Sequence, residues 1–255
     1  MLEAQHLVKR FHGHAAVSDV SFQLSPGEIL GYLGPNGSGK SMTLKMLTGL
    51  VEPTSGHIRY DGIDVTGGNI EFRRRFGYVP EEPYLYPFLS GREYLDLVAG
   101  LRDLPVSSTS PRIDALLDLF GLGEGAEQSI SAYSKGMKQK TLLIAALLHN
   151  PDLLVLDEPE SGLYVGSILL LRQLLRVLAQ RGKAILYSSH IVENVERLCT
   201  RVIVLGAGRV IVDGNVESIR TVAPSGSLEE AFAALAAQHP ASVACEIADI
   251  VTRHA

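Results

Sequence analysis

A glycine-rich loop near the N-terminus has the spacing of a phosphate-binding loop. The segment Gly34-Pro35-Asn36-Gly37-Ser38-Gly39-Lys40-Ser41 matches the pattern GxxxxGK[ST] at every fixed position. In such a loop the backbone N–H groups turn inward toward phosphate oxygens, and glycine allows a close approach. The Lys40 ammonium can meet the outer phosphates, and the Ser41 hydroxyl can bind Mg²⁺. We therefore expect residues 34–41 and the following Met42 to bind a nucleoside triphosphate.

The elements around this loop favour phosphate binding over a simple glycine-rich turn. Residues 28–33 are mostly apolar and predict a buried strand, and the apolar positions after Lys40 predict a helix as far as Leu50. The positive end of that helix would face a bound anion. A turn without a ligand remains the alternative, and the order strand, loop, helix argues against it.

Two adjacent carboxylates are expected at the same edge of the sheet. Asp157 and Glu158 follow the apolar run 153–156, which is typical of a central parallel strand. Asp157 can hold the Mg²⁺ that Ser41 contacts, through a water. Glu158 can orient and polarise the attacking water. A solvated acidic pair is the alternative, and the phosphate loop favours the catalytic interpretation.

The composition predicts a globular, cytoplasmic chain. It has 255 residues, 46% of them hydrophobic, and a net charge of −5, which disfavours non-specific nucleic-acid binding. Polar residues interrupt the apolar stretches around 142–148 and 168–178, whereas a spanning helix needs about 20 mostly apolar residues. Charges in residues 1–10 argue against a signal peptide. We expect Cys199 and Cys245 to be reduced thiols.

The order of predicted elements indicates an α/β fold with a parallel sheet. Strands are expected at 17–22, 28–33, 76–79, 153–156 and 183–188, with hairpins turning at 61–62 and 206–208. Helices are expected at 40–50, 168–180 and 192–198, and across 90–148 with breaks at 105–111 and 121–125. A capping-box pattern at 227–230 predicts a helix in the tail through Leu235.

The segment Tyr133-Ser134-Lys135-Gly136-Met137-Lys138-Gln139-Lys140 resembles the signature of the ATP-binding cassette family, whose usual core is LSGGQ. The resemblance covers nearly the whole chain, and Lys135 with Met137 resembles the branch that serves ABC-2-type exporters. It implies a P-loop NTPase with a RecA-like core, an N-terminal antiparallel β subdomain and an inserted helical subdomain at about 83–148. These parts would form one ATPase domain over 1–220, followed by a C-terminal helical appendage over 221–255.

The resemblance also implies roles for residues outside the phosphate loop. Ser134 and Gly136 would bind the γ-phosphate of ATP held by the other subunit, although a helix N-cap and its turn would give the same residues. Phe11 resembles the aromatic that stacks on adenine, with a core aromatic as the alternative. Glu81 replaces the usual glutamine that contacts Mg²⁺ or its water. His190 resembles the switch histidine that reaches the γ-phosphate.

One segment departs from the family pattern. Residues 160–164 read ESGLY where the family usually has TSGLD. Tyr164 therefore replaces the aspartate that links the two ATP sites across the dimer, and Glu160 replaces a small residue. We expect ATP binding to be intact and turnover to be low.

The implied function is an ATP hydrolase that uses Glu158, His190 and Lys40 and powers export by separate membrane-spanning permease subunits. Its expected cofactors are ATP and Mg²⁺, and its expected partners are the permeases and a second ATPase subunit, identical or different. It would lie on the inner face of the membrane. The alternatives are a cassette ATPase acting on nucleic acid or ribosomes, for which no basic stripe is visible, and a regulatory cassette with weak hydrolysis.

The segment 81–88 is dense in aromatic residues and prolines. We expect it to line the groove that docks on the membrane subunits, because exposed aromatic clusters often form interfaces. A buried linker between subdomains is an equal alternative. The sequence does not identify the transported substrate.

Overall fold

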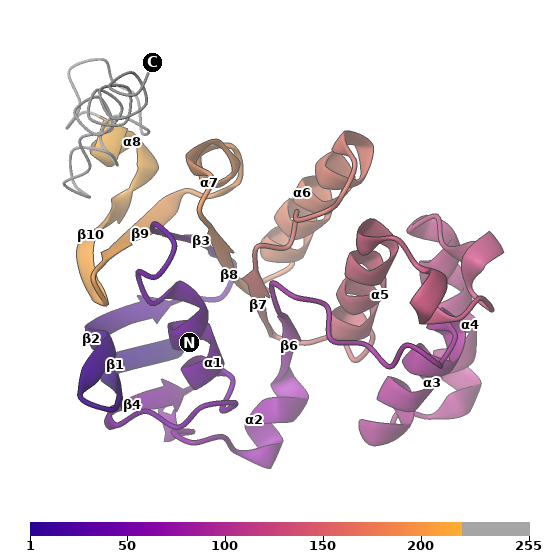
Figure 1. Ribbon diagram of the computed structural model, residues 1–255, viewed down its shortest axis with the longest axis horizontal. Coiled ribbons are helices and arrows are strands. Elements are labelled where there is room, and N and C mark those ends of the chain that lie inside the picture. Colours follow the sequence, from indigo (N-terminus) through magenta and orange to yellow (C-terminus); the bar gives the residue numbers. More distant parts are fainter. Residues whose placement is uncertain (221–255) are drawn as a thin grey trace, which may run out of the picture.

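Ten strands form one sheet in the computed structural model, which describes residues 1–220 (Figure 1). Their order across the sheet is β5-β4-β1-β2-β10-β9-β3-β8-β7-β6. The strands are β1 (Leu2–Phe11), β2 (His14–Leu24), β3 (Ile29–Leu33), β4 (Ser55–Tyr60), β5 (Ile63–Asp64), β6 (Phe76–Val79), β7 (Leu153–Asp157), β8 (Ala184–Ser189), β9 (Arg201–Gly206) and β10 (Arg209–Asn215).

The N-terminal half of the sheet is antiparallel. In β1 the residues Leu2, Ala4 and Leu7 are buried, and β1 pairs with both β2 and β4. One bridge, between Arg209 of β10 and Asp19 of β2, joins this part to the rest of the sheet. The sequence analysis did not predict β1, because charged residues break its apolar alternation.

In the other half, β10 is antiparallel to β9, and β9, β3, β8, β7 and β6 form a parallel core that positions the site. Strands β3, β8 and β7 are buried along their whole length, which explains why they read as continuous apolar runs. Leu33 pairs with Ser189, and Asp157 pairs with Ser188. The carboxyl ends of three neighbouring strands therefore meet at one edge.

The helices are α1 (Lys40–Leu47), α2 (Ile70–Arg75), α3 (Gly91–Leu101), α4 (Val106–Leu119), α5 (Lys135–Leu147), α6 (Val165–Gln180), α7 (Val192–Leu198) and α8 (Val216–Arg220), with short 3₁₀ turns η1 (Gly123–Gly125) and η2 (Ile130–Ala132). Gly49, with φ +67°, follows the end of α1 as predicted. Helix α6 begins three residues before the predicted position, and α2 was not predicted. The predicted tail helix and the appendage over 221–255 lie outside the described residues.

Helices α3, α4 and α5 form a separate group at one end of the sheet (Figure 1). Ser90 and Glu93 form a capping box at the start of α3. The predicted break over 105–111 is wrong: Pro105 is the N-cap of α4, and Pro111 lies inside the helix. Pro111 is the sixth residue of α4, past the first turn, so the helix lacks the backbone bond to the Ser107 carbonyl; α4 nevertheless continues and buries Ile113 and Leu117 beyond the proline.

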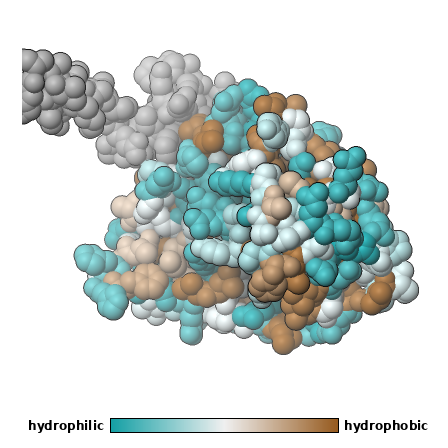
Figure 2. All heavy atoms as spheres, turned by 45° about the vertical axis from the view of Figure 1, so that its right-hand side comes forward, coloured by the Kyte–Doolittle hydropathy of each residue, from teal (hydrophilic) through white to brown (hydrophobic). Residues whose placement is uncertain are grey.

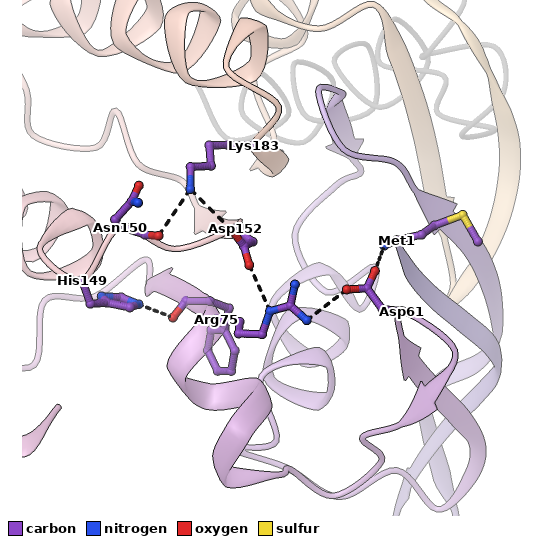
Figure 3. Close-up of polar contacts among 8 residues, drawn as sticks. Met1, Asp61, Arg75, His149, Asn150, Asp152 and Lys183 are labelled. Carbon is purple, nitrogen blue, oxygen red and sulfur yellow. Dashed lines mark hydrogen bonds and ion pairs between the residues drawn. The ribbon is translucent and has the colours of Figure 1, made fainter. Parts of the chain in front are cut away.

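A chain of ion pairs links the antiparallel part to the parallel core on the side where β1, β7 and β8 begin (Figure 3). Arg75 lies at its centre, 3.0 Å from Asp61 and 2.9 Å from Asp152. The N-terminal ammonium of Met1 pairs with Asp61, and Lys183 lies 3.5 Å from Asp152. These pairs are partly exposed, so each contributes about 0–1 kcal/mol.

His149 lies beside this network, with Nε2 3.0 Å from the Phe76 carbonyl (Figure 3). Burial and the nearby Arg102 lower the pKa of His149 from 6.5 to about 4. Between these two pKa values, His149 is therefore protonated in the unfolded chain and neutral in the folded chain. The stability contributed by neutral His149 is complete above pH 6.5 and is lost as the pH falls toward 4.

We expect the melting temperature of the unaltered chain to fall more between pH 7 and pH 4 than that of His149→Gln. Glutamine keeps a donor for the Phe76 carbonyl and does not titrate. Thermal melts at several pH values measure the difference, and parallel curves for the two proteins would contradict it.

Candidate active site

The phosphate loop joins the end of β3 to the start of α1, as predicted from the sequence. Gly39, the N-cap of α1, has φ +101°, and a Cβ atom there would lie 2.7 Å from the Ala16 carbonyl oxygen. Only glycine fits this position without strain. The loop borders a cavity of about 360 Å³. The residues lining it are Ala16, Asn36, Gly37, Gly39, Lys40, Ser41, Met42, Glu81 and Glu158.

Lys40 places a buried ammonium group at this cavity. Its Nζ donates hydrogen bonds to the carbonyls of Gly34, at 2.7 Å, and Pro35, at 3.3 Å. Burial lowers the pKa of Lys40, and the carboxylates of Glu158, Asp157 and Glu81 oppose that shift. An ammonium group set at a helix N-terminus can bind a polyphosphate.

The oxygen atoms needed for Mg²⁺ are present beside the loop. Asp157 is 1% exposed, and its Oδ1 atom has no hydrogen-bond partner within residues 1–220. A buried carboxylate oxygen without a partner is costly unless a cation pairs with it. Ser41 and Glu81 line the cavity beside the phosphate loop. Within residues 1–220, no cluster of three or more His, Cys, Asp and Glu side chains could hold a metal ion.

Glu158 is held by two side chains from the end of β8. Its Oε1 lies 2.7 Å from His190 Nδ1, and its Oε2 accepts a hydrogen bond from Ser189 Oγ at 3.2 Å. The side chain is nearly buried, and the backbone has φ +46°, which is uncommon outside glycine. The structure thus brings together Glu158 and His190, which the sequence predicts as two catalytic residues without predicting this contact. Ser189 was missed, although its place before His190 was a usable signal.

The signature residues lie at a second cavity, of about 390 Å³, formed where α5 and α6 begin. The Ser134 side chain accepts from Met137 N, so Ser134 caps α5. A Cβ atom on Gly136 would lie 2.6 Å from the Gly162 carbonyl oxygen, so glycine is required there. Neither Ser134 nor Gly136 lines the phosphate cavity. Within one chain the two sets of residues form two different cavities.

Phe11 ends β1 and is 45% exposed, so the alternative of a core aromatic is wrong. It does not line the phosphate cavity, and the Lys9 ammonium lies 5.1 Å from its ring.

A family model described as "ABC transporter" matches residues 17–161, more than half of the chain. This chain belongs to the ABC transporter ATPases. The ABC transporter ATP-binding protein NatA of Bacillus subtilis is 38% identical over 205 residues, which are 80% of this chain and 83% of that protein. The Nod factor export ATP-binding protein I of Burkholderia thailandensis is 39% identical over 213 residues, 84% of this chain and 70% of that protein.

Solved ABC structures share the fold. The ATP-binding subunit of an ABC transporter superposes with a TM-score of 0.84 at 35% identity, covering 92% of this chain and 99% of that chain. A dimeric structure of the bacterial ABC transporter cassette MJ0796 matches with a TM-score of 0.76 at 24% identity, covering 84% and 98%. The chain is thus an ATP-binding and ATP-hydrolysing subunit of an ABC transporter.

This ABC ATPase also has buried polar groups around its site whose surroundings could not be predicted from the sequence. Gln139 of α5 is fully buried, and its Nε2 donates to the Pro159 carbonyl at 3.2 Å. The Tyr78 hydroxyl is buried, and burial together with Asp157 and Glu81 raises its pKa. These residues come from elements distant in sequence, so no local pattern marks them.

Proposed function

We propose that this ABC ATPase powers export by closing with a second ATPase subunit around two ATP molecules and transmitting that closure to separate membrane-spanning permeases. The observation that carries the proposal is the separation of the phosphate cavity from the signature cavity in one chain. A head-to-tail pair would bring one subunit's signature cavity to the other's phosphate cavity. The dimeric MJ0796 cassette and the export relative support this arrangement.

The chain's own groups suit hydrolysis of the terminal phosphate of ATP. The phosphate loop and Lys40 would hold the phosphates in place. Glu158 would polarise a water and take its proton as the water attacks the γ-phosphorus and the bond to the β–γ bridging oxygen breaks. His190 is hydrogen-bonded to Glu158 and can therefore orient that carboxylate. In this proposal His190 also reaches the γ-phosphate. A bound Mg²⁺, held by Ser41, Asp157 and Glu81, would neutralise phosphate charge.

The start of α5 suits a phosphate supplied by the partner subunit. Ser134, Lys135 and Gly136 line the signature cavity at the positive end of a 13-residue helix. ATP would therefore bind the closed pair more tightly than the open one, and release of phosphate would remove that preference.

Tyr164 is expected to weaken the link between the two ATP sites. It is 89% exposed beside the signature cavity and stands at the N-cap of α6 without a side-chain cap. Tyr164→Asp should raise ATP turnover, because it restores the residue usual in the family at the link between the two ATP sites. As the N-cap of α6, the aspartate should also stabilise the helix by about 1 kcal/mol. Steady-state phosphate release measures the turnover. Tyr164→Phe is the control, and unchanged turnover in Tyr164→Asp would refute the expectation.

The aromatic segment 81–88 is exposed, so the alternative of a buried linker is wrong. Tyr84 is 79%, Tyr86 52% and Phe88 76% exposed, and the rings of Tyr86 and Phe88 lie 6.0 Å apart. Figure 2 shows apolar patches among polar residues on the face that carries the helical group. We propose that the aromatic segment docks on the permease.

The docking proposal is tested by co-purification with a multi-spanning permease subunit. Tyr84→Ala/Tyr86→Ala should reduce recovery of the complex about tenfold or more. Ile63→Ala removes a similarly exposed apolar residue from β5 and should leave recovery unchanged. Equal recovery of both variants would count against docking through this segment.

No helix within residues 1–220 is long and apolar enough to span a membrane. We propose that the chain works on the inner face of the membrane through its permease partners. We also propose that residues 1–220 form one ATPase domain in which residues 83–148 are the helical subdomain.

A further inference from the structure

A buried ion pair lies between the phosphate cavity and the signature cavity. Glu160 and Arg172 are each 8% exposed. Arg172 Nε donates to Glu160 Oε1 and Nη2 donates to Oε2, both at 2.7 Å. The pair joins the loop after β7 to the middle of α6. Such a bidentate arrangement fixes both side chains in direction as well as distance.

The same guanidinium reaches a third element. Arg172 Nη2 also donates to Asn194 Oδ1 at 2.9 Å, and Asn194 belongs to α7, which begins two residues after His190. The Tyr187 hydroxyl lies beside Glu160, and burial together with that carboxylate raises the pKa of the hydroxyl. Arg172 therefore bonds to the Glu160 carboxylate on one side and to Asn194 of α7 on the other.

These contacts, together with the one between Glu158 and His190, form a closed ring of interactions that includes Glu158. Glu158 contacts His190 at one point of the ring. Two residues after Glu158, Glu160 pairs with Arg172, and Arg172 bonds to Asn194, four residues after His190. The loop that carries Glu158 and the segment that carries His190 are thus fastened together twice.

Stability alone does not account for this pair. The cost of removing two charges from water can exceed their attraction, and replacing a buried pair by apolar residues of similar volume is often neutral or stabilising. A rigid bidentate pair does, however, define one geometry for the elements it joins. A misplacement of about 1 Å at a reacting group can cost about a hundredfold in rate.

We propose that Glu160 and Arg172 are positioning residues that hold Glu158 and His190 in their relative geometry, and so set the rate of hydrolysis without setting the affinity for ATP. The inference rests on the role proposed above for Glu158. Neither residue lines the phosphate cavity, which is why ATP affinity should not depend on them.

The test replaces the pair by apolar residues in Glu160→Leu/Arg172→Met, which leaves no unpaired buried charge. We expect a folded protein whose ATP dissociation constant stays within about twofold, while kcat falls between about tenfold and a hundredfold. Arg172→Lys keeps the charge but loses the two parallel hydrogen bonds of the guanidinium. Its kcat should therefore lie between that of the unaltered chain and that of Glu160→Leu/Arg172→Met. This second variant keeps the test decisive if the double variant does not fold.

A second ion pair provides the matched control. Arg201 and Asp213 are also joined by two bonds of 2.7 Å, and neither lines the phosphate or signature cavity. Arg201 also lies 3.1 Å from Glu28, so Arg201→Lys, which keeps a cation beside both carboxylates, is the control for Arg172→Lys and should keep the kcat of the unaltered chain.

Three results would overturn the proposal: an unchanged kcat in Glu160→Leu/Arg172→Met, an unchanged kcat in Arg172→Lys, or a loss of ATP affinity that accounts for the fall in rate. Glu158→Gln measured alongside separates this inference from the proposed function. If Glu158→Gln loses turnover and the pair variants do not, only the positioning role fails.

Discussion

Glu158→Gln is expected to lower ATP turnover by about 10²- to 10⁴-fold, because the amide cannot take a proton from the attacking water. The variant should bind ATP normally, since glutamine keeps the shape of the side chain and can still accept a hydrogen bond from Ser189. Single-turnover phosphate release measures the rate, and equilibrium titration with a fluorescent ATP analogue measures binding. If closure depends on ATP, the variant should also accumulate as a dimer when ATP is present.

Glu193→Gln is the matched control for this experiment. Glu193 is an exposed glutamate of α7, paired with Arg197 one turn away, and it does not line the phosphate cavity. It should turn over ATP at the rate of the unaltered chain. Normal turnover in Glu158→Gln would remove the proton-accepting role of Glu158.

Local patterns predicted the centre of this site. The phosphate loop, the strand before it and the helix after it occupy one continuous stretch of sequence. Their residue types alone therefore predict the strand, the loop and the helix in order. The buried strand ending in Asp157 was equally clear, because a central parallel strand needs apolar side chains on both faces. Because the carboxyl ends of parallel strands lie at one edge of a sheet, the sequence also predicted that Asp157 and the phosphate loop meet at that edge.

The contacts around this centre could not be predicted in the same way. Glu160 and Arg172 are 12 positions apart, and Asn194 is 22 positions from Arg172. Gln139 of α5 reaches the Pro159 carbonyl across 20 positions of sequence. Each of these residues has an ordinary local context, and only the folded arrangement makes it a partner of the others.

Errors in the predicted elements have the same origin. Proline disfavours helix interiors, so the sequence predicts a break as far as Pro111; α4 instead runs through it, with Ile113 and Leu117 buried on the far side. Strand β1 was missed because half of it faces solvent and carries charges, while its pairing with β2 and β4 stabilises it. Tertiary pairing overrode local preference in the strand.

Lys40→Ala is expected to weaken ATP binding by about 10- to 150-fold, the effect of losing a charged hydrogen bond worth about 1.5–3 kcal/mol. The buried ammonium of Lys40 lines the phosphate cavity, and three carboxylates around it are placed to raise its pKa against the effect of burial. Removing it leaves those carboxylates to repel the phosphates. Lys45→Ala, an exposed lysine in the last turn of the same helix, is the control and should bind ATP normally.

The most direct measurement is therefore the dissociation constant of ATP in the presence of Mg²⁺ for the unaltered chain, Lys40→Ala and Lys45→Ala. We expect only Lys40→Ala to bind weakly, with its melting temperature showing that it is folded. If Lys40→Ala bound ATP as tightly as the unaltered chain, the cavity beside the glycine-rich loop would not be the nucleotide site.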